Sequence, residues 1–416
     1  MSTTTDPIIL DALGTDVQAE GARLRERGSV TEVVLPGDVR AWTINTDAAV
    51  RRVLGDDRFA KDATKNWPDF INGNIAEDFP LIGWVLMDNM TTHDGVDHAR
   101  LRKQVTRSFT SRRVQEMRPD IERITADLLD TLAATPPGET ADLKSTFAYP
   151  LPTIVICELF GIPEEYRAEV MRGGEVNVDT TITHEEAVAN VEQWHQAMYD
   201  LIDLRRREPA DDLLSALIAI QKEDPANISD SELAGTLHLF LGAGSETTTN
   251  LICNAVVSLQ ENPDQFELVR TGQVPWSAVV EETLRYHSPI AQMPFRFPTE
   301  DIEIDGVTIP KGDPVLVGFA SAGRDPERHG EDADRFDVTR SSFDHVSFGH
   351  GLHRCLGAPL GRLEGVIALP ALYERFPDLM IAQPLSEVRP QPTFLLHGPA
   401  ALPVNLGRDT QARISA

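Results

Sequence analysis

A single cysteine near the C-terminus, Cys355, lies in the glycine-rich run FGHGLHRCLG from Phe348 to Gly357. Glycine lets the backbone approach a flat ligand closely and adopt positive φ angles. The next residues, 358–364, carry a proline at their second position, which is typical of the first turn of a helix. We therefore expect Cys355 at a helix N-terminus, where the helix dipole and free N–H groups favour a thiolate. A thiolate in a glycine-lined loop has the chemistry of an axial ligand of haem iron.

Two other kinds of site fit this run less well. A zinc site built from His350, His353 and Cys355 lacks a fourth ligand and the usual ligand spacing. A dinucleotide-binding loop would need a third glycine where Arg354 stands, and a helix starting at that point. The interpretation that the residues favour is a cysteine that ligates haem.

A second run that could carry chemistry lies inside the longest predicted helix. We expect this helix to follow the N-cap Ser229 and to continue to about Glu261, over on the order of 45 Å. Its centre holds the run LGAGSETTT from Leu241 to Thr249, in which glycine and threonine lower helix propensity. Such a sequence in a central helix predicts either the close approach of another helix or a local distortion. A nucleotide-binding loop is disfavoured, because no strand precedes the run and Thr247 is not glycine.

The remaining patterns predict a mostly helical α+β protein. Alternating apolar residues predict strands at 30–35 and 41–44, and a hairpin over 301–309 with Asp305-Gly306 at its turn. Helical periodicity dominates elsewhere. We expect a small sheet region from the two ends of the chain beside a large helical region around the long central helix.

The charge is unevenly distributed along the chain. The 416 residues are 41% hydrophobic and carry a net charge of −27, which argues against general nucleic-acid binding. Residues 98–115 reverse this trend. They contain no acidic residue and six basic ones: Arg100, Arg102, Lys103, Arg107, Arg112 and Arg113. This segment is either a solvated helix face or a docking patch for an acidic partner.

The sequence also bears on location and redox state. No apolar stretch is long enough to span a membrane, and the N-terminus lacks the basic and apolar regions of a signal peptide. We therefore expect a cytoplasmic protein without a membrane anchor. Three cysteines provide no disulfide framework, and Cys157 and Cys253 stand in apolar runs that are typical of a core.

The cysteine run resembles the haem-binding signature of the cytochrome P450 family, the haem-thiolate monooxygenases. The signature is a Phe-Gly-x-Gly-x-His/Arg-x-Cys-x-Gly pattern. Its positions are matched by Phe348, Gly349, Gly351, His353, Cys355 and Gly357. The resemblance covers nearly the whole chain and implies haem b held by Cys355, with Phe348, Gly349 and Gly357 around the ligand.

The same resemblance implies the family's fold in a single domain over residues 1–416. Its β-rich lobe would comprise about 25–60 and 290–320 together with the C-terminal end. Its helical lobe would comprise about 95–285 and 355–376.

The run in the long helix is similar to the family's oxygen-binding groove, through Ala243, Gly244, Glu246 and Thr247. The resemblance implies that Ala243 lies beside the haem. It also implies that Glu246 and Thr247 form an acid–alcohol pair that delivers protons during catalysis.

Glu282 and Arg285 are similar to the family's Glu-x-x-Arg motif, and their spacing puts them on one helix face. The resemblance implies a buried structural ion pair with a third partner later in the chain, for which Arg335 is the candidate. The proline that usually stands two positions before this arginine is replaced by Ala333.

Haem carries two propionates, and carboxylates in a pocket need cationic partners. The family positions that hold them are occupied here by His98, Arg102, Arg296 and His353. Residues 66–90 correspond to the family's loop over the substrate. The candidates for the substrate pocket are Trp84, Leu239, Ala243, Thr247, Ile290, Met293 and Leu395. These residues carry no charge, which predicts a hydrophobic substrate.

Together these resemblances imply a monooxygenase that inserts one atom of O2 into a hydrophobic small molecule, by default through hydroxylation of a polyketide, peptide, terpene or steroid. The chain contains no flavin or iron–sulfur module, so electrons from NAD(P)H must arrive through external proteins. The resemblance implies a ferredoxin and a ferredoxin reductase. Alternatives on the same haem are a peroxide-driven peroxygenase and oxidative aromatic coupling. A non-enzymatic haem sensor has no need of the Glu246–Thr247 pair.

Overall fold

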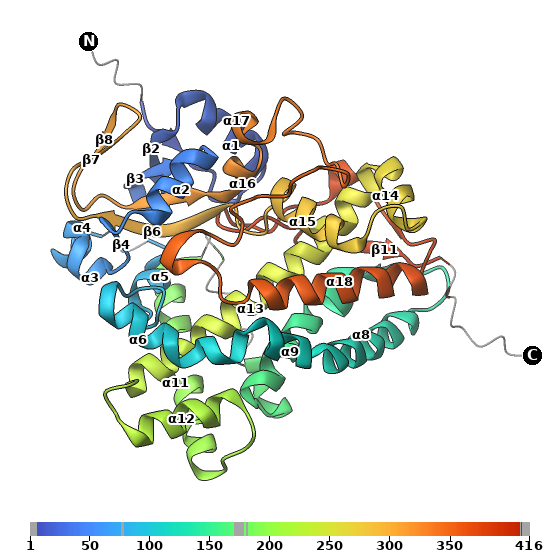
Figure 1. Ribbon diagram of the computed structural model, residues 1–416, viewed down its shortest axis with the longest axis horizontal. Helices are drawn as coiled ribbons and strands as arrows, with labels where there is room; N and C mark the ends of the chain where they lie inside the picture. Colours follow the sequence, from blue (N-terminus) through green and yellow to red (C-terminus); the bar gives the residue numbers. More distant parts are fainter. Residues whose placement is uncertain (1–5, 76–78, 170–178, 180–181, 408, 410–416) are drawn as a thin grey trace, which may run out of the picture.

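The computed structural model describes residues 6–75, 79–169, 179, 182–407 and 409 (Figure 1). The helices are α1 (Val17–Arg27), α2 (Asp47–Gly55), α3 (Ala63–Asn66), α4 (Pro68–Ile71), α5 (Ile82–Leu86), α6 (Gly95–Thr106), α7 (Ser111–Glu116), α8 (Arg118–Ala133), α9 (Pro150–Phe160), α11 (His184–Arg207), α12 (Leu213–Glu223), α13 (Asp230–Glu261), α14 (Pro263–Arg270), α15 (Trp276–Tyr286), α16 (Phe319–Gly323), α17 (Pro326–His329) and α18 (Ala358–Arg375). The strands are β1 (Ile8–Ile9), β2 (Val30–Leu35), β3 (Val39–Ile44), β4 (Phe59–Ala60), β5 (Ala141–Asp142), β6 (Gln292–Pro298), β7 (Ile302–Ile304), β8 (Val307–Ile309), β9 (Val315–Gly318), β10 (Met380–Ile381) and β11 (Pro403–Asn405). The mostly helical fold with a small β region is confirmed.

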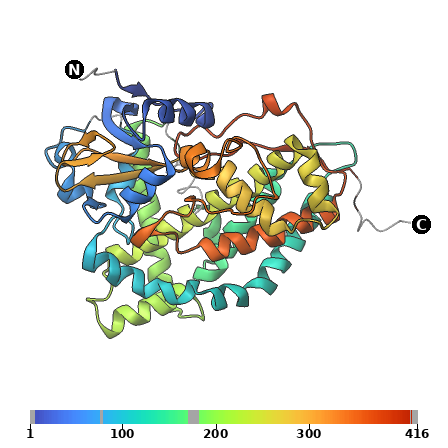
Figure 2. The ribbon, with the colours of Figure 1, turned by 45° about the horizontal axis from the view of Figure 1, so that its top comes forward.

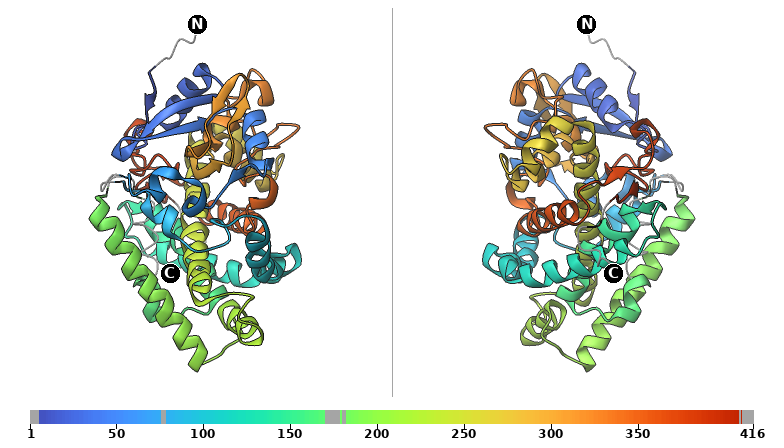
Figure 3. Two further views of the ribbon diagram at one scale, coloured as in Figure 1. Left: turned by 90° about the vertical axis from the view of Figure 1, so that its left-hand side faces the viewer. Right: turned by 90° about the vertical axis from the view of Figure 1, so that its right-hand side faces the viewer.

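The long central helix α13 begins and ends where the sequence predicts. Its N-terminus is closed by a capping box, in which Ser229 accepts from the backbone N–H of Glu232 and the Glu232 carboxylate accepts from that of Ser229. The helix passes through the interior and packs on α9, α11, α15 and α18 (Figures 1 and 3).

The glycines in the centre of α13 allow close packing. A Cβ atom added to Gly244 would lie 2.8 Å from a side-chain carbon of Ile156 in α9. The stretch from Leu241 to Thr249 nevertheless stays α-helical. Of the two expected outcomes, the close approach of another helix is therefore the one observed.

The strands of the main sheet lie in the order β1-β2-β3-β9-β6-β4. They come from the first sixty residues and from 292–318, and they gather at one side of the molecule (Figure 2). The hairpin of β7 and β8 forms as predicted, because Asp305 and Gly306 both adopt positive φ, at 50° and 82°.

The C-terminal strand pairs outside the main sheet. This strand, β11, lies between β10 and β5 in a separate three-stranded sheet. The chain meets the β region just before this strand, where Leu396 forms an isolated bridge with Ile290 and the carbonyl of Leu395 accepts from Ala291. The proposed division into two lobes of one domain stays a prediction.

The main apolar core lies among α8, α9, α13, α15 and α18. Both Cys157 and Cys253 are fully buried in it, as predicted. A second cluster joins the sheet to the segment before α6, with Trp67 and Phe79 packed against Phe297 and its neighbours. No helix in the described part of the chain is both long and apolar enough to cross a membrane.

Candidate active site

The cysteine run forms a loop closed on itself in front of α18. Gly349 and Gly351 have φ angles of 71° and 69°, which glycine adopts without strain. A Cβ atom on Gly351 would lie 2.5 Å from the carbonyl oxygen of Leu54, so no larger residue fits there. The backbone N–H of Cys355 donates to the carbonyl of Phe348 at 2.8 Å. This bond places Cys355 at the end of the loop, three residues before the helix.

Cys355 is the accessible cysteine of the three in the chain. The backbone N–H groups of Gly357 and Ala358 hydrogen-bond its sulfur, and they lower its pKa together with Arg102 and Arg354. Although the residue is exposed, desolvation of the sulfur by the surrounding loop is the larger effect and raises the pKa above its usual value. The N–H groups at the helix start therefore act on the sulfur in the expected direction, but they do not outweigh its desolvation. A metal cation at the sulfur would supply the missing stabilisation.

Five basic side chains converge next to this loop from separate parts of the chain. We call them the cationic cluster, which consists of Lys61, His98, Arg102, Arg296 and His353. The rings of His98 and His353 lie 4.1 Å apart, and Arg296 is 6% exposed. Burial and the neighbouring cations, with Lys61 first among them, lower the pKa of His353 to about 2. Burial and Arg296 lower that of Lys61 to about 7.

The cationic cluster is arranged to receive an anion. Asp94 is the acid whose charge acts on Lys61, His98 and Arg296, and its carboxylate also binds the backbone N–H of Lys61. The Nε2 atom of His98 is buried and has no hydrogen-bond partner among the described residues. A ligand with two carboxylates beside Cys355 would pair with the Arg102 and Arg296 guanidiniums and accept hydrogen bonds from the other members of the cluster, and haem is such a ligand. The residues therefore fit the group that the sequence implies.

Lys61 was missed by the sequence analysis, and nothing in its local sequence marks it. It follows β4, which pairs with β6 so that Ala60 lies opposite Phe297. This pairing lets the Lys61 ammonium donate to the carbonyls of Phe295 and Pro294, at 2.6 and 3.3 Å, beside Arg296. Only strand pairing between distant segments brings the two cations together.

Two side chains of α13 border open space in the middle of an otherwise buried helix. Ala243 is exposed and Thr247 is half-buried, one turn further along the same face. The Thr247 hydroxyl donates to the carbonyl of Ala243 at 2.8 Å. Glu246 is 5% exposed and interacts with Gln391 and Lys144 instead. The two members of the predicted acid–alcohol pair thus lie on different faces of the helix.

Comparison with known proteins identifies the family. The family model "Cytochrome P450" matches residues 177–272 and 276–400. The chain belongs to the cytochrome P450 family. It is 50% identical to 2-hydroxy-5-methyl-1-naphthoate 7-hydroxylase of Streptomyces carzinostaticus, over 96% of this chain and 97% of that one. It is 39% identical to 6-deoxyerythronolide B hydroxylase of Saccharopolyspora erythraea, over 97% and 99% of the two chains.

Solved structures place this P450 in the same fold. CYP154C4 from Streptomyces sp. W2061 superposes with a TM-score of 0.94 at 41% identity, covering 97% of this chain and 99% of that one. The P450 is accordingly a haem-iron monooxygenase of the hydroxylase type found in natural-product biosynthesis. As for the family generally, it acts on a small molecule and receives electrons from partner proteins.

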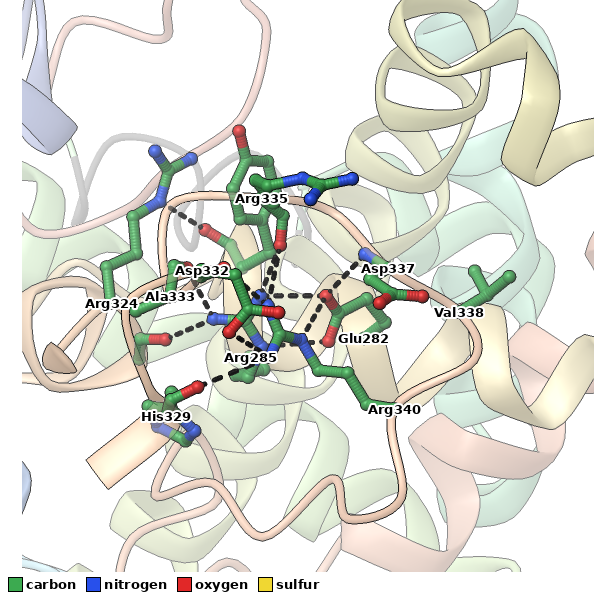
Figure 4. Close-up of polar contacts among 12 residues, drawn as sticks. Glu282, Arg285, Arg324, His329, Asp332, Ala333, Arg335, Asp337, Val338 and Arg340 are labelled. Atoms are coloured by element: carbon green, nitrogen blue, oxygen red, sulfur yellow. Dashed lines mark hydrogen bonds and ion pairs between the residues drawn. The ribbon is translucent and has the colours of Figure 1, made fainter. Parts of the chain in front are cut away.

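The Glu282–Arg285 motif of this P450 is the centre of a buried ion-pair network (Figure 4). Both side chains are fully buried, and the guanidinium donates to the two carboxylate oxygens at 2.8 and 2.7 Å. The third cation is Arg340, whose Nε donates to Glu282 at 3.1 Å. The assignment of Arg335 is therefore wrong, because its side chain is exposed and only its carbonyl binds Arg285. The chain turns between 335 and 340, which brings the later arginine inward.

The substrate-pocket candidates differ in how accessible they are. Ala243 is exposed, while Trp84, Leu239, Thr247, Ile290 and Met293 are half-buried. Leu395 is 1% exposed and packs in the apolar cluster beside the sheet, so the structure places it in the core. Residues 76–78 of the predicted substrate loop lie outside the described residues.

A zinc site in the cysteine loop finds no support. Within the described ranges, the one group with potential metal-ligand atoms within 4.8 Å of one another is Asp88, His93 and Glu232. A neighbouring cation already pairs with this group, since Arg100 forms an ion pair with Glu232. It is therefore a structural link between α6, α13 and the segment before α6.

Proposed function

We propose that this P450 holds haem b between Cys355 and α13, with the haem propionates at the cationic cluster. The observation that carries this proposal is the group of basic side chains beside the accessible cysteine, in which Arg296 is buried and the Nε2 atom of His98 has no hydrogen-bond partner among the described residues. Bound haem supplies oxygen activation, which places one atom of O2 into a substrate C–H bond. The protein's own residues bind the substrate, exclude water and deliver protons.

The substrate class that we infer is an aromatic polyketide-type acid. The support is the 50% identity to a naphthoate hydroxylase over 96% of this chain, against 39% to the 6-deoxyerythronolide B enzyme. We expect 2-hydroxy-1-naphthoic acid to shift the Soret band of the ferric protein to its high-spin position, with a Kd about tenfold or more below that of testosterone or 6-deoxyerythronolide B. Tighter binding of either comparison compound would contradict this assignment.

We propose that proton delivery depends on Glu246 and Thr247. Glu246→Gln and Thr247→Ala are expected to leave haem binding intact and to lower product per NAD(P)H consumed by about tenfold or more, because positioned acids and alcohols contribute at least that much to proton transfer. The electrons then appear as hydrogen peroxide, which is measured directly. Thr248→Ala serves as the control, because its hydroxyl faces Glu364 of α18 instead. Unchanged coupling in both variants would favour a peroxide-driven enzyme.

We further propose that electrons come from NAD(P)H through a ferredoxin and its reductase, in the cytoplasm where these proteins work. The basic segment is linked to the cysteine loop by Arg102, which donates to the carbonyl of Arg354 at 2.7 Å. Lys103 and Arg107 are exposed and form no ion pair with any described residue. Arg100 is not available for docking, because it pairs with Glu232 and Asp97.

Charge reversal tests this docking surface. Lys103→Glu with Arg107→Glu is expected to slow reduction by an acidic ferredoxin about tenfold at low salt and to flatten the salt dependence of the rate. The matched control reverses Arg40 and Lys311 in the sheet region, which changes the net charge equally. Peroxide-driven turnover should be the same in all proteins. Equal slowing by the control pair would show a general charge effect and remove the docking surface.

A further inference from the structure

Lys144 places an ammonium group inside the protein beside the carboxylate of Glu246. It begins the single π-helical turn η3 (Lys144–Ala148), a conformation that is frequent at functional sites, and is 9% exposed. Its Nζ lies 3.0 Å from the carbonyl oxygen of Pro399, 3.4 Å from Oε1 of Gln391 and 3.9 Å from Oε2 of Glu246. Because a buried charge is costly unless it is paired, Lys144 and Glu246 depend on each other.

Gln391 forms a second connection between the same two residues. Its amide oxygen accepts from Lys144 and, at 3.5 Å, from Asn250. Two donors on this oxygen determine the direction of the amide, so that its NH2 group faces Glu246 and donates to Oε2 at 3.4 Å. Lys144 therefore favours the ionised carboxylate directly, by its charge, and indirectly, by orienting Gln391.

The position of Glu246 on α13 gives this pairing a consequence for proton transfer. Successive side chains leave an α-helix about 100° apart, so Glu246 and the adjacent Thr247 point in different directions. Thr247 lies on the face of the exposed Ala243, whereas Glu246 is buried towards Lys144 and Gln391. Proton exchange on the Thr247 side therefore depends on where Lys144 and Gln391 hold this carboxylate.

We propose that Lys144 is a positioning residue for proton delivery, which holds Glu246 ionised and turned towards Gln391 between turnovers. This inference rests on the proposed role of Glu246. It adds a residue from outside α13 that determines where the acid points and when it is charged.

The other titratable groups near this network do not replace Lys144. Asp142 of β5 accepts from the backbone N–H groups of Lys144 and Leu402. Burial raises the pKa of Cys253 to about 12 and that of Glu364 in α18 to about 8, so both are mainly neutral at pH 7. Among the described residues, Lys144 is the cation that forms an ion pair with Glu246.

The test compares Lys144→Gln, which removes the charge, with Lys144→Arg, which keeps it, in the haem-loaded protein. The first readout is the infrared band of protonated carboxyl groups, taken as the difference between Lys144→Gln and the double variant with Glu246→Gln. We expect Lys144→Gln to introduce a protonated carboxyl at pH 7, and Lys144→Arg to suppress it. The contribution of Glu364 cancels in this difference.

The second readout is peroxide released per NAD(P)H, with 2-hydroxy-1-naphthoic acid as the probe, as a function of pH. Lys144→Gln is expected to raise peroxide severalfold and to shift the pH profile upwards by about one unit, since loss of a paired cation raises a carboxyl pKa. Lys144→Arg should restore most of the wild-type profile. Normal infrared and pH behaviour in Lys144→Gln would overturn the inference.

Two further outcomes separate this inference from the proposed function. If Glu246→Gln leaves coupling unchanged while the infrared band still responds to Lys144, the proposed role of Glu246 fails and the pairing stands. If Lys144→Gln does not fold, Gln391→Met removes the bridging amide with Lys144 in place. It should produce the same two changes at smaller size, and their absence would then overturn the inference.

Discussion

Replacing Cys355 with histidine is expected to abolish the red-shifted Soret band that thiolate ligation should give the reduced, carbon monoxide-treated protein. The structure gives the reason, because Cys355 is the accessible cysteine at the end of a closed loop, with two backbone N–H groups directed at its sulfur. Imidazole is a neutral ligand and cannot push electron density onto the iron as a thiolate does. Hydroxylation should be lost with the band. The measurement is the carbon monoxide difference spectrum.

The control for this change is Cys157→Ser. Cys157 is fully buried in the main core, far along the chain from the loop, and its substitution should leave the band in place. Haem content of all proteins is measured by the pyridine haemochrome assay. A red-shifted band that survives in Cys355→His would assign the ligand to another residue and would contradict the site described above.

Removing the charge of Glu282 is expected to have the largest effect on stability. Glu282→Gln leaves the fully buried guanidinium of Arg285 without its anion, and breaking a buried ion pair in this way costs about 3–5 kcal/mol of unfolding free energy. The backbone N–H of Asp337 also loses a charged acceptor. The measurement is urea-induced unfolding of the haem-loaded protein, followed by circular dichroism and by the Soret band.

Two arginine variants test which residue completes this network. Arg340→Met removes the Nε–carboxylate contact at 3.1 Å and further bonds to the loop, so we expect a loss of about 1–3 kcal/mol. Arg335→Met should change the free energy of unfolding by less than about 0.5 kcal/mol, because its side chain is exposed and its carbonyl is retained. The opposite order would restore the sequence-based assignment of Arg335.

Local signals in the sequence were sufficient where neighbouring residues determine the structure. The capping box at Ser229 and Glu232 starts α13, and the Asp305-Gly306 turn closes a hairpin, because each depends on residues only one to three positions apart. The cysteine loop belongs to the same class. Gly349 and Gly351 take the positive φ angles that the run predicts, and the hydrogen bond from Cys355 to Phe348 joins residues seven positions apart.

The tertiary structure alone decided which distant side chains meet. Arg340 replaces Arg335 beside Glu282 because the chain turns between them. Arg100 of the basic segment pairs with Glu232 instead of facing solvent, because α6 lies beside the start of α13. Lys61 joins the cationic cluster, and Lys144 meets Glu246, only through contacts between segments more than one hundred residues apart. Such contacts leave no pattern in the local sequence, since long-range packing and the pairing of buried charges determine them.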